Sequence, residues 1–130
     1  MVSTAFDYAK FLQMLQNGGA LDGHRILSPA TVAFMAVDHL GQIGPGPTTY
    51  LPGPGYGFGI GFAVRRQAGV AAYEGSGGDC YWGGAAGTSF WNDPKHYLTV
   101  VFMMQAPSQL FHYVPLLRNM VYAALIELEK

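Results

Sequence analysis

Three runs of strand-forming residues, separated by short turns, constrain the fold of this chain more than any other feature. They lie at residues 80–84, 88–92 and 97–105, within the stretch "DCYWGGAAGTSFWNDPKHYLTVVFMM". The sequence "NDPK" at 92–95 is a strong turn signal between the last two runs. Glycine inside a strand usually marks a bulge or the close approach of a backbone or ligand. Such glycines occur in the first run and just after it, at Gly83, Gly84 and Gly87.

Two helices are predicted before these strands. Thr4 and Asp7 have the spacing of a capping box, and an apolar face with helical periodicity continues to the Asn17-Gly18-Gly19 sequence. Ser28 is placed to cap a second helix with Pro29 at its first position, extending to about His39. We expect its buried face to hold Val32, Met35 and Ala36.

The chain is also expected to end in a helix, with Pro115 in or near its first turn. Its apolar positions suggest a core-facing side formed by Leu117, Val121, Leu125 and Leu128.

Two glycine-rich stretches separate the second helix from the three strands. Residues 41–55 contain nine glycines and prolines among fifteen residues, a composition typical of a long surface loop or flap. In "YGFGIGFAVRR", at 56–66, aromatic and aliphatic residues alternate with glycine. This alternation predicts one strand with a bare face, against which a helix or another backbone packs closely.

The predicted order of elements favours an α+β fold in which helices cover an antiparallel sheet. The length of 130 residues is typical of one domain, spanning 1–130. Charged residues make up 12% of the chain and the formal net charge is −1, so the basic patch that nucleic-acid binding needs is missing. No apolar stretch is long enough to span a membrane. The start of the chain lacks the features of a signal peptide, which favours a soluble, cytoplasmic protein.

A search for catalytic motifs within the 130 residues finds none that is complete. No serine starts an S-x-x-K or lies in G-x-S-x-G, and no histidine pair has metal-binding spacing. The glycine-rich stretches contain neither G-x-G-x-x-G nor a P-loop, so we expect no cofactor and no metal. One reading left open is an unrelated hydrolase that uses Ser76 or Cys80 with a histidine.

The stretches "GYGFGIGFAV" and "YWGGAAGTSFWNDPKHYLTVVFMMQ" resemble the C-terminal part of the serine β-lactamase-like superfamily. The closest resemblance is to the branch of class C β-lactamases, esterases and penicillin-binding proteins. The stretches "STAFDYAKFLQMLQNGG" and "LDGHRILSPATV" fit the same family in the same order. The resemblance implies the C-terminal portion of a β-lactamase/transpeptidase-like fold.

The resemblance also implies roles for four adjacent residues. Trp82, Gly83 and Gly84 hold the positions of the family's third motif, on a strand that edges the substrate site. The backbone N–H of Ala85 would form one half of an oxyanion hole, and the nucleophilic serine's own N–H the other half. Trp82 replaces the cationic or imidazole residue that β-lactamases place there, which favours an esterase-type relative acting on a small acyl or ester substrate.

The family's S-x-x-K and Tyr-x-Asn motifs are absent from these 130 residues, so we expect the chain to be a C-terminal fragment that is inactive alone. The apolar, uncharged strand at 97–105 would make a poor free edge. We therefore expect it to pair with a second copy, a swapped element or a separate N-terminal half. The alternative function is a non-catalytic, homo-oligomeric interaction module that reuses half of the hydrolase fold.

Overall fold

The computed structural model describes residues 2–41, 43 and 52–126. Most of the predicted flap at 41–55 lies outside these residues. The first half contains α1 (Ala5–Gln16), β1 (Ala20–Leu21), β2 (His24–Arg25) and α2 (Pro29–Met35). The second half contains β3 (Tyr56–Phe58), β4 (Ala63–Arg65), β5 (Cys80–Gly83), β6 (Ser89–Asp93), the short 3-10 helix η1 (Pro94–His96), β7 (Leu98–Phe102), the 3-10 helix η2 (Pro107–Gln109) and α3 (Leu110–Ala123). The predicted α+β class is confirmed.

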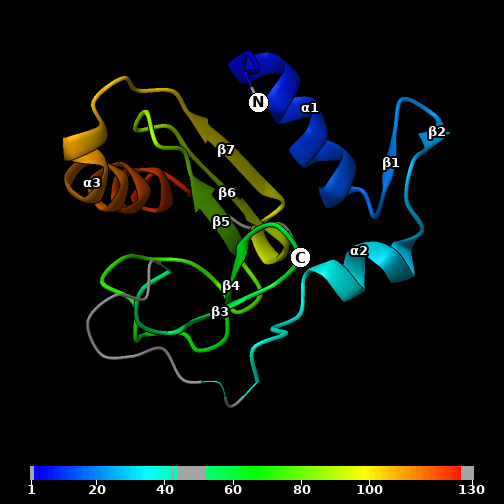
Figure 1. The fold of residues 1–130 in the computed structure, drawn as a ribbon, viewed down its shortest axis with the longest axis horizontal. Coiled ribbons are helices and arrows are strands. Elements are labelled where there is room, and N and C mark those ends of the chain that lie inside the picture. The colour runs from blue at the N-terminus through cyan, green and yellow to red at the C-terminus, as the bar shows by residue number, and fades with distance from the viewer. Residues whose placement is uncertain (1, 42, 44–51, 127–130) are drawn as a thin grey trace.

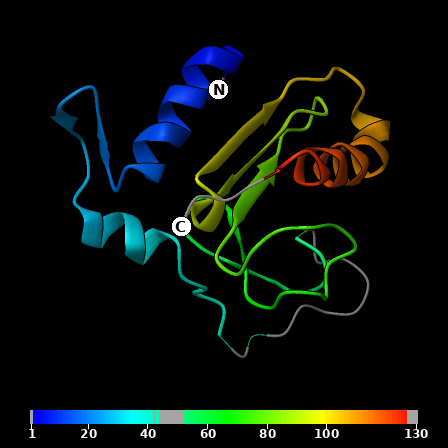
Figure 2. The same cartoon turned by 180° about the vertical axis from the view of Figure 1, so that it is seen from behind.

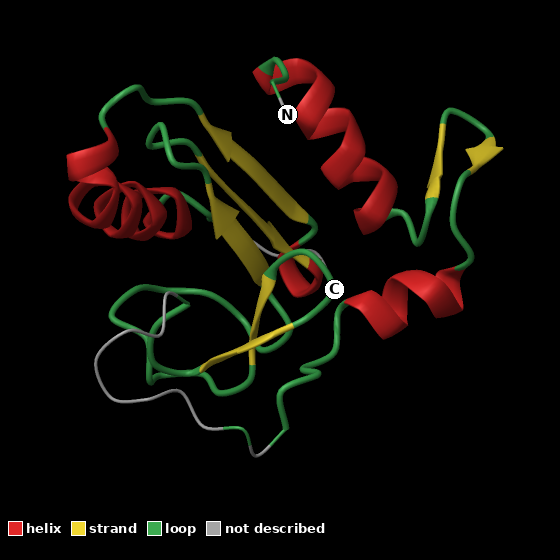
Figure 3. Ribbon diagram, viewed as in Figure 1, coloured by secondary structure: helices red, strands yellow, loops and turns green. Residues whose placement is uncertain are grey.

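Strands β3 to β7 form an antiparallel sheet in the order β3-β4-β5-β6-β7, and β1 and β2 form a separate small hairpin. Helix α1, the small hairpin and α2 lie on one side of this sheet, and α3 lies on the other (Figures 1 and 2). Figure 3 shows the same layers by secondary structure, with the long loops gathered near β3 and β4.

Alternation along the strands divides the sheet into two faces. On the α1 face, Leu12 and Leu15 pack with Phe62, Cys80 and Phe90 in the main apolar core. The α3 face carries different chemistry. There the guanidinium of Arg118 stacks over the rings of two tyrosines and a tryptophan, namely Tyr73, Tyr81 and Trp91. The polar site described below belongs to this second face.

The capping residues and the Asn-Gly-Gly sequence correctly predicted both ends of α1 and the start of α2. The hydroxyl of Thr4 accepts a hydrogen bond from the N–H of Asp7, and α1 ends at Gln16, just before the predicted Asn17. Ser28 caps α2 with Pro29 in its first turn. The extension of α2 to His39 was wrong, because the helix ends at Met35 and the Met35 carbonyl accepts instead from the N–H of Ile60.

The single strand predicted at 56–66 is also wrong, since these residues form the β3–β4 hairpin. The chain reverses at Gly61, whose φ is 93°. The expectation of close backbone contact at the bare glycines is nevertheless confirmed at Gly59. A Cβ built there would overlap the backbone carbonyl of Met35.

Helix α3 buries a different stripe from the predicted one. Its buried residues are Val114, Arg118 and Tyr122, whereas Leu117, Val121 and Leu125 are half-buried and Leu128 lies outside the described residues. Pro115 lies inside the helix, five residues after its start at Leu110. Arg118 is a buried charge in the middle of this stripe, so it needs a polar partner, which is described next.

Candidate functional site

The end of strand β5 has one open edge. Strand β4 pairs only with Cys80 and Tyr81, whereas β6 pairs with β5 as far as Gly83. In the described part of the chain, Trp82 and Gly83 therefore have no strand partner on the side away from β6. An unpaired strand edge presents backbone N–H and C=O groups to whatever lies beside it.

A four-residue turn follows this edge and exposes Ala85. The N–H of Gly87 donates to the carbonyl of Gly84 at 3.0 Å, and the N–H of Gly84 donates to Thr88 at 2.7 Å. Ala85 is exposed, and among residues 52–126 no acceptor is hydrogen-bonded to its N–H. The turn thus leaves a backbone donor free at the end of the open edge.

Two of the three glycines have structural reasons that are independent of any substrate. A Cβ built on Gly84 would collide with the hydroxyl of Thr88. Gly87 has a φ of +104°, and a Cβ there would lie 3.0 Å from the backbone of Ala106. Because the hairpin itself requires these two glycines, neither one is evidence for a ligand.

Gly83 is different, because its missing side chain would face helix α3. A Cβ built there would lie 3.2 Å from Cδ2 of Leu110, the first residue of α3. A cavity of about 260 Å³ lies at this point between β5 and α3. Its lining includes all four residues of the predicted site, Trp82 to Ala85, together with Leu110, Val114 and other α3 residues.

The indole of Trp82 lies mainly on the opposite face of the sheet. It packs edge-on against the ring of Phe58, with centroids 5.0 Å apart, and against the core beneath α1. Trp82 and Gly83 therefore present their side-chain positions to the two different faces at the same open edge.

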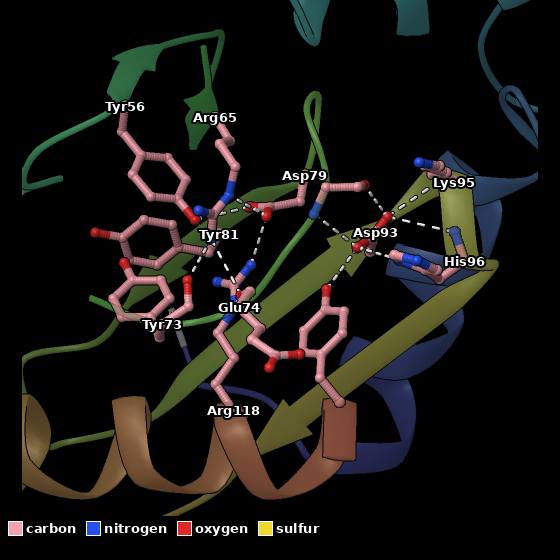
Figure 4. Close-up of polar contacts among 12 residues, drawn as sticks. Tyr56, Arg65, Tyr73, Glu74, Asp79, Tyr81, Asp93, Lys95, His96 and Arg118 are labelled. Carbon is pink, nitrogen blue, oxygen red and sulfur yellow. Dashed lines mark hydrogen bonds and ion pairs between the residues drawn. The ribbon is translucent and has the colours of Figure 1, made fainter. Parts of the chain in front are cut away.

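A buried ionic cluster joins β4, α3 and the residue before β5, and it was not predicted from the sequence (Figure 4). Its centre is the fully buried carboxylate of Asp79, which lies 2.6 Å from Nε of Arg65 and 2.7 Å from Nη2 of Arg118. The hydroxyl of Tyr56 donates to the same carboxylate at 2.9 Å. Both guanidiniums also donate to the backbone carbonyl of Glu74. The cluster ties α3 to the residue just before β5.

A second buried carboxylate, Asp93, holds the turn between β6 and β7. It accepts hydrogen bonds from the hydroxyls of Ser76 and Tyr122, and from Nδ1 of His96 at 2.7 Å. Burial alone would raise the pKa of Asp93, but the hydrogen bonds from Ser76, Tyr122 and His96 outweigh it and lower the pKa to about 2. It also caps η1 by accepting from the N–H of Lys95.

The surroundings of Ser76 and Cys80, the two candidate nucleophiles in the sequence, argue against a catalytic role for either. The Ser76 hydroxyl donates to Asp93 rather than to an imidazole, so these residues lack the Ser–His hydrogen bond of a catalytic triad. Burial, followed by the charge of Asp79, raises the pKa of the Cys80 thiol to about 12. A thiol in this state is protonated at neutral pH and is a poor nucleophile.

In the part of the chain that the structure describes, no three His, Cys, Asp or Glu side chains are grouped as possible metal ligands. None of the helices in the same residues is long and apolar enough to cross a membrane.

Comparison with known proteins relates this geometry to a hydrolase. No family model matches the sequence. Two proteins of Mycobacterium tuberculosis, Protein Rv1367c and the uncharacterized protein MT1414, are each 34% identical over 109 residues, which cover 79% of this chain. The chain spans 27% of the length of both.

A solved structure is also similar. It is that of EstCE1, a hydrolase with promiscuous acyltransferase activity. The two share 31% sequence identity with a TM-score of 0.76, over 92% of this chain and 30% of EstCE1. This chain has a hydrolase fold. The proposed roles of Trp82 to Ala85 are taken up below.

Proposed function

We propose that this chain forms the oxyanion side of the acyl-transfer site in an esterase-type, β-lactamase-like serine hydrolase. The observation that carries the proposal is the free N–H of exposed Ala85, at the end of a strand edge that has no partner in the described residues. The similarity to EstCE1 supports the reaction class.

In the proposed reaction, a serine hydroxyl attacks the carbonyl carbon of an ester and its proton passes to a base. The electron pair of the C=O bond moves to oxygen, which becomes an oxyanion. The N–H of Ala85 donates to that oxygen, together with the N–H of the attacking serine. Donors placed in this way act most strongly on the charge that develops in the transition state.

The nucleophile of the proposed reaction comes from outside these 130 residues, since they contain no S-x-x-K. We therefore expect the chain alone to lack esterase activity. We also propose that strand β7 pairs along its outer edge with a strand from the segment that carries the serine. The residues of β7, "LTVVF", are uncharged, and β6 is its only strand partner in the described sheet. Long apolar edges of this kind favour pairing.

The same edge supports the second candidate function, a non-catalytic module that forms homo-oligomers by pairing β7 with β7. Size-exclusion chromatography with light scattering separates the two. A well-defined, soluble dimer of the chain that no serine-bearing segment displaces would favour the module.

The test of the hydrolase proposal uses a chimera in which this chain replaces the matching portion of EstCE1. We expect the chimera to hydrolyse p-nitrophenyl butyrate and to react with a fluorophosphonate probe, and the 130-residue chain to do neither. Hydrolysis by the chain alone, blocked by that probe, would contradict the expected location of the nucleophile. A folded chimera without activity would overturn the proposed function.

A further inference from the structure

We propose that the cavity between β5 and α3 receives an uncharged alkyl or aryl group of the substrate. This inference rests on the proposed function, because it assigns a substrate class to the same site. It is carried by the volume of the cavity, by the lack of charge among the described residues that line it and by its position beside Ala85.

The size of the cavity suits a small apolar group. Its volume is about 260 Å³. An apolar cavity of about 150 Å³ in another protein is large enough to bind benzene. Gly83 lies on the β5 side of the cavity, where a Cβ would lie 3.2 Å from Cδ2 of Leu110, and Leu110, Val114 and Pro115 line the opposite side on α3.

Charge excludes the alternative of an ionic substrate group. None of the described residues that line the cavity is acidic or basic. The nearest cation on the same helix is Arg118, one turn beyond Val114, and it is 1% exposed. Its guanidinium is held by Asp79 and by the carbonyl of Glu74. A carboxylate in the cavity would therefore lose its hydration without gaining a partner.

The position of the cavity links it to the reacting group. Gly84 and Ala85 also line it, so the cavity reaches the turn that carries the backbone donor proposed to bind the oxyanion. A substrate whose carbonyl oxygen meets the N–H of Ala85 would have one of its substituents beside Gly83. The cavity would then select for that substituent by its size and lack of charge.

Binding is tested directly on the 130-residue chain, with no need for a nucleophile. Toluene is titrated into the ¹⁵N-labelled chain while the amide shifts of Gly83, Gly84 and Ala85 are followed by NMR. Benzoate, which has nearly the same shape but is charged, is the matched ligand. We expect saturable shifts with toluene and none at equal concentration with benzoate.

Two substitutions fill the cavity, and one leaves it unchanged. Val114→Phe adds bulk at a buried lining residue, and Leu110→Phe adds bulk at the first residue of α3, so that a folding defect in either variant leaves the other informative. Leu116→Phe, at a position on the same helix that is 50% exposed and does not line the cavity, is the control. We expect both fillers to weaken toluene binding by roughly tenfold or more and the control to leave it unchanged.

The chimera with EstCE1 identifies which side of the ester enters the cavity. Lengthening the acyl chain of p-nitrophenyl esters tests the acyl side, and lengthening the alcohol of acetate esters tests the other. Val114→Phe should reduce kcat/KM for the long members of one series only.

The outcomes separate this inference from the proposed function. If toluene fails to bind, or binds equally well to both filled variants, the inference is overturned even when the chimera is active. If toluene binds as expected and the folded chimera is inactive, the cavity stands and the proposed reaction fails.

Discussion

Removing the charge of Asp79 should destabilise the fold much more than removing the arginine that it pairs with on α3. Asp79→Asn leaves two buried guanidiniums, those of Arg65 and Arg118, without the carboxylate that lies within 2.7 Å of each. Arg118→Met instead leaves the pair of Arg65 and Asp79 complete. The carbonyl of Glu74 also keeps a hydrogen bond from Arg65, at 3.1 Å.

The magnitudes follow from this difference in what remains buried. Breaking a buried ion pair from one side costs about 3–5 kcal/mol, because a charge stays behind without compensation. Arg118→Met loses a charge-assisted contact of about 1.5–3 kcal/mol but also removes a buried charge, so we expect a net cost of at most about 2 kcal/mol. A chain of 130 residues has a typical stability of about 6–20 kcal/mol, so both variants should fold.

Urea unfolding at pH 7, followed by circular dichroism, measures both costs. With a slope of about 1–3 kcal/mol per molar urea, Asp79→Asn should lower the midpoint by about 2 M, and Arg118→Met by less than half of that. Equal slopes for the three proteins would show that the midpoints report stability alone. If Arg118→Met costs as much as Asp79→Asn, the carboxylate is not the centre of the cluster and the reasoning fails.

Three further results are expected. In the chimera with EstCE1, Ala85→Pro removes the backbone donor at the second position of the Gly84–Gly87 turn, where proline fits. We expect it to lower kcat by about 100- to 1,000-fold. The control Ala85→Gly keeps the N–H and should lower kcat far less. The pKa of Asp93 falls from 3.8 to about 2 on folding, so its ionised carboxylate contributes about 2 kcal/mol to the free energy of unfolding. This contribution is present above pH 4 and is lost as the pH falls to 2. The urea midpoint should therefore fall less between pH 4 and pH 2 in Asp93→Asn than in the unchanged protein. Gly59→Ala should lower the thermal midpoint because its Cβ would overlap the Met35 carbonyl, whereas Gly77→Ala, with open space around it, should not; equal effects would contradict the close approach.

Local chemistry explains why much of the fold could be predicted from the sequence. The caps at Thr4 and Ser28 involve residues three positions apart, so the spacing alone indicates them. The β6–β7 turn follows from the "NDPK" sequence at 92–95. The hairpin at 56–65 was missed because alternating glycines also fit one strand. At its turn the N–H of Ile60 donates to the carbonyl of Met35, a contact between residues that are distant in the sequence.

The buried cluster could not be found in the same way, because Arg65, Asp79 and Arg118 come from distant parts of the sequence. One signal was available. Arg118 lies four residues from Val114 and from Tyr122, which places a cation within the stripe that α3 buries. A charged residue in a buried stripe requires a partner, but the sequence does not say which carboxylate it is.

The cluster and the cavity share two elements, which has a consequence for the site. Arg118 joins α3 to Asp79, and Asp79 directly precedes β5. The same helix and strand form the two walls of the cavity at Leu110 and Gly83. The ion pair therefore joins the helix and the strand that form those walls, at a point on α3 about two helical turns from Leu110. Since Gly84 and Gly87 are explained by the hairpin, the site depends on two features: the wall spacing at Gly83 and the turn that frees the N–H of Ala85.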